Sequence, residues 1–89
     1  MNKEEALHLL EGKSFADKRK REYYSAIQAL KNPGTKVRCG KRAYSGKYST
    51  TISWLHDVKA LFARLGFTNY VYGNDAPRGG RQGDYIIVH

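Results

Sequence analysis

Acidic residues, cysteine and long apolar runs are all scarce in this sequence of 89 residues. Because Cys39 is the one cysteine, no internal disulfide framework is possible, and we expect a reducing, cytoplasmic environment. No apolar run approaches the roughly 18 residues of a membrane span. Residues 1–5 are acidic and lack the apolar stretch of a signal peptide. These absences predict a cytoplasmic protein without a membrane partner.

The chain is too short for two separate cores. A chain of this size buries roughly 60% of its unfolded surface, which supports one small core. Hydrophobic residues make up 40% and charged residues 27% of the sequence, which is ordinary for a globular protein. We therefore predict a single compact domain over residues 1–89 and no extended disorder.

Positive charge is what the sequence has in excess. Sixteen Lys and Arg against eight Asp and Glu give a net charge of +8. Two segments hold most of it: residues 13–21 have five cations and one acid, and residues 36–47 have five cations and no acid. Clustered cations are typical of proteins that bind phosphate groups. The same clusters also occur on surfaces that only keep a protein soluble.

The N-terminal third is predicted to be a helical hairpin over residues 1–32. Asn2 precedes a first helix at 3–10, and Ser14 opens a second helix at 14–31, each as an N-cap. The apolar positions of the second helix are spaced for one face: Phe15, Ala16, Tyr23, Ile27 and Leu30.

The middle of the chain is predicted to hold a basic strand and loop at 35–48 and a helix at 50–66. A hydroxyl residue at 49–51 would cap this helix, and Gly66 would end it. Residues 68–89 are predicted to form a β-hairpin around a long glycine-rich loop at 73–83.

Residues 85–88 are continuously apolar, which indicates a strand inside the sheet. The order of elements predicts a small α+β domain in which the antiparallel hairpin packs on the helices.

No arrangement of residues typical of catalysis or metal binding is present. His56 and Asp57 are adjacent on a predicted helix and point in different directions. One cysteine and three histidines lack metal-ligand spacing. Residues 34–41 resemble a phosphate-binding loop, but five residues instead of four separate the glycines. We predict no catalytic residue, no metal and no cofactor, and hence a protein that is not an enzyme.

Candidate nucleic-acid contacts come from three parts of the chain. Those on the second helix are of types that reach phosphates and base edges: Lys18, Arg19, Arg21, Ser25 and Gln28. Those in the central segment are Lys36, Arg38, Lys41, Arg42, Tyr44, Lys47 and Tyr48. Arg78 and Arg81 lie in the glycine-rich loop. The first two helices are compatible with a helix-turn-helix, and the C-terminal hairpin with the wing of a winged helix.

Tyrosine is the second compositional signal. Tyr44 and Tyr48 lie among cations, a pattern that suits single strands whose bases stack on aromatic rings. The other five are predicted to be core or half-buried sheet residues: Tyr23, Tyr24, Tyr70, Tyr72 and Tyr85.

The function that these features favour is a small basic nucleic-acid-binding accessory or regulatory protein. It would contact mainly phosphates, through residues 13–21, 36–48 and 78–81. The alternative is a non-enzymatic inhibitor or adaptor that blocks a nucleic-acid-handling machine: a polymerase, a nuclease or an RNA-guided defence complex. A less favoured third is a metal-independent ribonuclease that uses His56, Arg78, Arg81 and Tyr85. The choice between DNA and RNA, the strandedness and the oligomeric state stay open.

Overall fold

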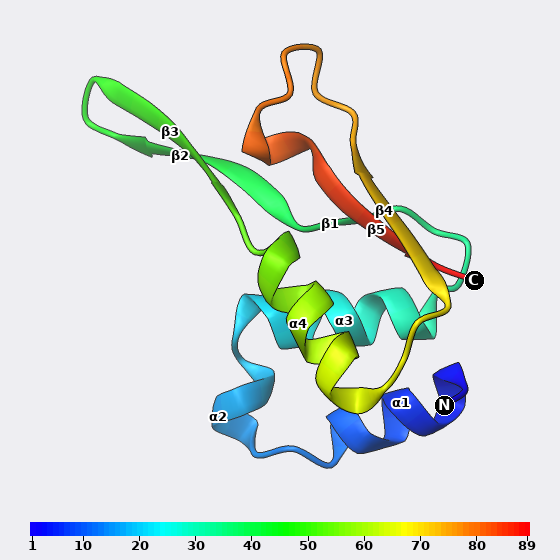
Figure 1. The fold of residues 1–89 in the computed structure, drawn as a ribbon. Helices are drawn as coiled ribbons and strands as arrows, with labels where there is room; N and C mark the ends of the chain where they lie inside the picture. Colours follow the sequence, from blue (N-terminus) through cyan, green and yellow to red (C-terminus); the bar gives the residue numbers. More distant parts are fainter.

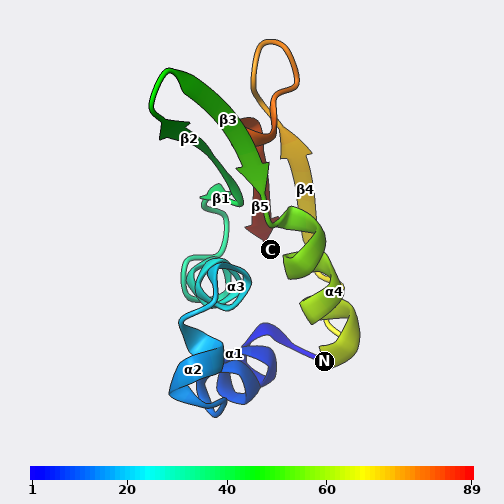
Figure 2. The ribbon, with the colours of Figure 1, turned by 90° about the vertical axis from the view of Figure 1, so that its left-hand side faces the viewer.

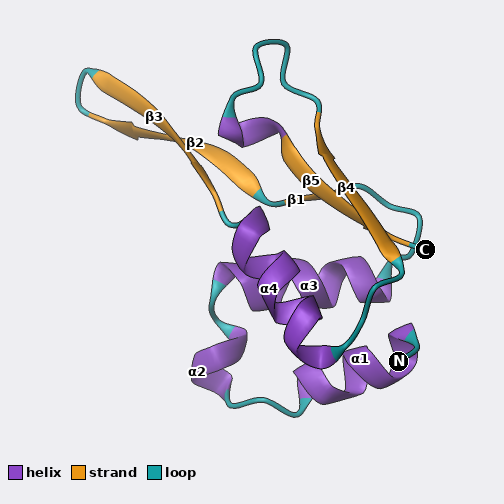
Figure 3. Cartoon of the chain, in the orientation of Figure 1, coloured by secondary structure: helices purple, strands orange, loops and turns teal.

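The computed structural model describes residues 1–89 and separates a helical layer from a sheet (Figures 1 and 3). The helices are α1 (Lys3–Glu11), α2 (Phe15–Lys18), α3 (Arg21–Lys31) and α4 (Leu55–Leu65). The strands are β1 (Val37–Arg38), β2 (Gly40–Ser45), β3 (Tyr48–Ser53), β4 (Tyr70–Asn74) and β5 (Asp84–Val88), and a 3₁₀ turn, η1 (Arg81–Gly83), precedes β5. The chain is an α+β domain, as predicted.

The main sheet has the antiparallel order β1-β5-β4. Ile86 of β5 stands opposite Val37 on one side and Tyr72 on the other. The central position of β5 confirms the interior strand that its apolar run predicted, and Ile86 and Val88 are fully buried.

The core lies between this sheet and the helices. Leu55, Val58, Leu61 and Phe62 form the buried stripe of α4. Phe62 packs against Phe67 and Tyr70, in each case with ring centroids 5.1 Å apart. The predicted caps of the first two helices and the predicted end of α4 are confirmed: Asn2 and Ser14 accept backbone N–H groups, and Gly66 has a φ of 82°.

The prediction of one continuous helix over 14–31 is wrong. The helix ends after α2 and restarts as α3, because Lys20 is extended, with ψ 144°. Six consecutive charged residues, 17–22, leave no apolar side chain that would hold both halves on the same core. Phe15 is 75% exposed and lies outside the apolar face assigned to it.

The prediction that residues 49–51 cap a helix is also wrong, because these residues belong to β3. After Tyr48, this strand consists of Ser, Thr and Ile, and β-branched residues favour extended backbone. Residues 40–53 form a β2–β3 hairpin, so the segment 35–48 holds two strands and part of a third rather than one strand and a loop.

Two segments project from the same end of the molecule, as Figure 2 shows from a second direction. One is the β2–β3 hairpin, and the other is the loop 75–83 between β4 and β5. They extend the molecule to 44 Å along its longest axis. The radius of gyration is 13.5 Å, whereas a compact chain of this length is expected to have about 12 Å. We call residues 40–53 and 75–83 the basic end.

Candidate nucleic-acid interface

The β2–β3 hairpin presents a different set of side chains on each face. Cross-strand partners share a face, so the pairs Arg42–Thr51 and Tyr44–Ser49 lie on one side. The Arg42 guanidinium donates to Ser49 Oγ at 3.3 Å along this face. Lys41 and Tyr48 lie on the opposite side.

The hairpin ends in the two residues Gly46 and Lys47. Gly46 has a φ of 59°, and no residue other than glycine has a positive φ. A positive φ at the first loop position alone is the pattern of a type II′ turn, which matches the twist of the flanking strands. Lys47 is thereby placed at the tip of the hairpin.

The hairpin is anchored only at its base. A Cβ at Gly40 would overlap the carbonyl of Arg81, so the two backbones are in direct contact. Ser53 Oγ donates to Asp84 Oδ2 at 2.6 Å. Beyond Gly40 no hairpin residue is buried, and a two-stranded hairpin without an apolar face adds little to stability. Its exposed side chains are therefore available for an interaction.

The loop 75–83 is held in place by polar contacts. The Asn74 amide donates to Gly80 O and to Asp84 Oδ1, each at 2.8 Å. Asp75 accepts from Arg38 and from Lys36 Nζ, with distances of 2.6 to 2.8 Å. The hydrogen bonds from Arg38, then those from Lys36, hold the pKa of the Asp75 carboxyl well below its usual range.

A groove separates the hairpin from this loop. It has a volume of about 310 Å³. Its lining residues come from both segments: Arg42, Thr51, Pro77, Arg78, Gly80 and Gln82. Neither arginine takes part in an ion pair. Gln82 Oε1 is buried and has no hydrogen-bond partner.

Seven of the predicted site residues gather at the basic end, and all are exposed: Lys41, Arg42, Tyr44, Lys47, Tyr48, Arg78 and Arg81. Tyr44 is 77% and Tyr48 80% exposed. Lys36 and Arg38 do not belong to this unpaired set, because both are ion-paired with the one carboxylate of Asp75. Through Asp75 they fasten the loop to β1, and their role as phosphate contacts stays a prediction.

The candidate contacts on α2 and α3 differ in exposure and in hydrogen bonding. Ser25, predicted to contact nucleic acid from the surface of its helix, is instead buried, with 3% of its surface exposed. Its hydroxyl accepts from Trp54 Nε1 at 2.8 Å and donates to Arg38 O at 3.2 Å. A helix-turn-helix that reads bases through Ser25 does not fit this burial. Gln28 is half-buried, and Lys18 Nζ donates to Glu11 O at 3.1 Å.

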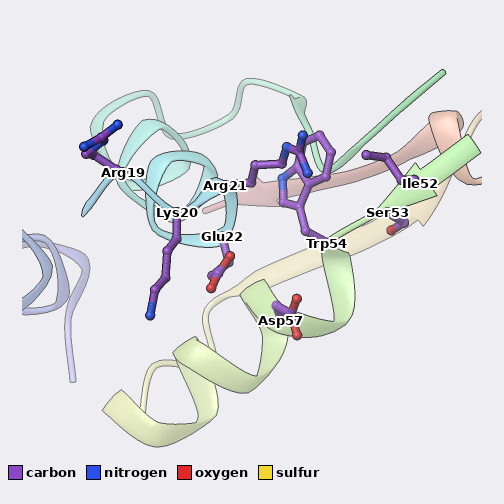
Figure 4. Close-up of a pocket in the computed structure, with 8 residues that line it drawn as sticks. All are labelled: Arg19, Lys20, Arg21, Glu22, Ile52, Ser53, Trp54 and Asp57. Atoms are coloured by element: carbon purple, nitrogen blue, oxygen red, sulfur yellow. The ribbon is translucent and has the colours of Figure 1, made fainter. Parts of the chain in front are cut away.

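Arg19 and Arg21 line a second hollow, between α3 and α4 (Figure 4). The Arg21 guanidinium lies over the Trp54 ring, 5.4 Å from its centroid. Glu22 and Asp57 add two carboxylates to the same lining. Mixed charge makes this hollow a weaker phosphate site than the groove at the basic end.

Sequence reasoning missed three residues of the groove. Thr51, Pro77 and Gln82 carry no charge, and only the fold brings them together. The predicted burial of Tyr24 and Tyr72 is wrong, because both rings are exposed. Lys59 Nζ lies 3.9 Å from the centroid of the Tyr72 ring.

Cys39 is fully buried, as expected for a small apolar residue. Burial raises the pKa of its thiol to about 12, so the reactive thiolate is not formed at neutral pH. None of the helices has both the length and the apolar character that crossing a membrane requires.

Comparison with protein-family models, with curated proteins and with solved structures finds no match for this chain.

Proposed function

We propose that this chain is a non-enzymatic nucleic-acid-binding protein that contacts its partner through the basic end. The observation that supports this most directly is the β2–β3 hairpin, an exposed ribbon that carries Lys41, Arg42 and Lys47 and no acid. Two-stranded ribbons of this kind are one of the elements that proteins insert into nucleic-acid grooves.

The charge around the hairpin supports the same proposal. Arg78 and Arg81 add two cations from the neighbouring loop, and neither forms an ion pair. Asp75, the one acid of that loop, is already neutralised by Lys36 and Arg38. The basic end thus attracts phosphates, and binding would be driven mainly by release of counterions.

A second candidate function follows from the tyrosines. Tyr44 is exposed on the same face of the hairpin as Arg42, and Tyr48 is exposed on the opposite face. Tyr and Arg are among the residues most enriched at the energetic centres of protein interfaces. The same end would then dock on a nucleic-acid-handling protein and block it.

The test is a binding titration of the intact chain with labelled single-stranded RNA, single-stranded DNA and duplex DNA at low salt. We compare Arg42→Ala/Lys47→Ala with Arg64→Ala/Lys13→Ala, which removes one exposed Arg and one exposed Lys outside the basic end. The first pair should weaken binding about tenfold or more, and the control pair about twofold or less.

Equal losses in both pairs would refute the assignment of binding to the basic end. Absence of binding by the intact chain would refute the nucleic-acid function. The protein-blocking function would then be tested with the same two variants, by inhibition assays on purified polymerases and nucleases.

A further inference from the structure

We infer that the groove between the hairpin and the loop 75–83 binds an unpaired nucleobase of a single strand, and that Gln82 recognises its edge. This inference rests on the proposed function and adds to it the strandedness of the partner and a base-reading residue. It follows from an unsatisfied amide, from the charges of the walls and from the shape of the groove.

The Gln82 carboxamide has no partner within the protein. Its Oε1 atom is buried and unbonded, and its Nε2 atom takes part in no hydrogen bond. A buried polar atom left unpaired is unfavourable, and native structures leave few of them. Because Oε1 is shielded from solvent, Nε2 is the end of the amide that a ligand reaches, and it would donate to an acceptor on a base edge.

Gly80 sets the position of this amide. A Cβ at Gly80 would overlap the Gln82 carboxamide. The backbone of Gly80, with φ −62° and ψ 150°, is one that any residue adopts. The absence of a side chain therefore serves to give the Gln82 amide its space in the groove, not to permit an unusual turn.

Cations stand on both walls of the groove. Arg42 comes from the hairpin and Arg78 from the loop, and neither is neutralised by an acid. A base between them would place the phosphates of its own strand near two guanidinium groups, which bind phosphate oxygens with two parallel hydrogen bonds. Thr51 and Pro77 complete the lining.

The shape of the groove favours a single strand over a duplex. It is a hollow of about 310 Å³, near the lower limit of pockets that hold small organic molecules. A base enters such a hollow only when it is unstacked and unpaired. Tyr44 lies on the same face of the hairpin as Arg42, two residues nearer the tip, and its exposed ring offers a stacking surface for a neighbouring base.

The experiment measures the affinity of the intact chain for labelled oligomers of dA, dC, dT and rU and for a mixed-sequence duplex. We expect single strands to bind at least about tenfold more tightly than the duplex. We also expect the four oligomers to differ in affinity. Gln82→Leu should shrink the difference between the tightest and the weakest oligomer by about fivefold or more. Gly80→Ala should do the same, because it displaces the amide. Asn69→Leu is the control, because Asn69 is an exposed amide outside the groove.

Each result decides a separate point. Equal or tighter binding of the duplex would overturn the inference and leave the proposed function standing, as would an unchanged ranking of the oligomers in both Gln82→Leu and Gly80→Ala. If the unmodified chain binds neither the single strands nor the duplex, the proposed function is overturned as well. Thermal unfolding of each variant shows whether it folds. If Gln82→Leu does not fold, the test of base preference uses Gly80→Ala instead.

Discussion

The affinity of the basic end for nucleic acid should depend on salt to an extent that the structure fixes. Five of its cations have no acidic partner: Lys41, Arg42, Lys47, Arg78 and Arg81. If each neutralises one phosphate of a single strand, the logarithm of the association constant falls with the logarithm of salt concentration with a slope of about −3.5. Between 50 and 200 mM salt, the affinity would then fall about 100-fold.

The pairing of Asp75 makes this prediction sharper. Lys36 and Arg38 are left out of the sum because Asp75 holds them. The variant Asp75→Asn releases both cations, and the slope should steepen toward about −5. Fluorescence anisotropy of a labelled single strand at several salt concentrations measures both slopes. A slope near −5 in the unmodified chain would refute the separation of paired from unpaired cations. A slope shallower than about −1 would refute phosphate contact altogether.

Three further predictions concern the parts that position the basic end. Ser25→Ala removes the acceptor of the Trp54 indole N–H, and chemical denaturation should show a loss of about 1–3 kcal/mol; an unchanged midpoint would mean that water replaces the hydroxyl. Gly40→Ala should lower the melting temperature and detach the hairpin base, because its Cβ overlaps Arg81 O; an unaltered circular-dichroism spectrum and melting curve would argue against this contact. The pKa of Asp75 is lowered in the fold, so its contribution to stability is present above its ordinary pKa of about 4 and is lost as the pH falls below that value. The difference in melting temperature between the unmodified chain and Asp75→Asn should therefore shrink from pH 7 to pH 2, and a constant difference would contradict the ion pair.

Patterns that act over short distances were readable from the sequence. The caps at Asn2 and Ser14 and the terminator Gly66 each depend on a few neighbouring residues, and all three are confirmed. The apolar run in β5 was enough to place that strand at the centre of its sheet.

Features that depend on distant partners were not readable. Residues 49–53 have hydroxyl side chains that suit a helix cap as well as a strand, and pairing with β2 decides between them. Ser25 has the spacing of an exposed helical residue, but Trp54 and Arg38 cover it from elsewhere in the chain. Gln82 lies in a glycine-rich stretch without any pattern, and only the approach of the hairpin makes it part of a groove.

Arg38 and Arg42 show why a basic segment does not by itself define a binding surface. They are four residues apart in one cluster, yet Arg38 pairs with an acid 37 positions away and Arg42 with none. The position of the acidic residues also affects how charge is distributed over the molecule. Glu4, Glu5 and Glu11 belong to α1, which lies at the end of the molecule opposite to the hairpin and the loop (Figure 1). Residues 1–32 nevertheless carry seven cations against five acids, a net charge of +2, whereas residues 40–53 and 75–83 carry five cations against one acid, a net charge of +4. Positive charge is therefore denser at the basic end, which favours the approach of a polyanion to that end. The fold thus gathers cations without acidic partners on the projecting hairpin and loop, while acids in α1, α2 and α3 offset most of the cations in the helical layer.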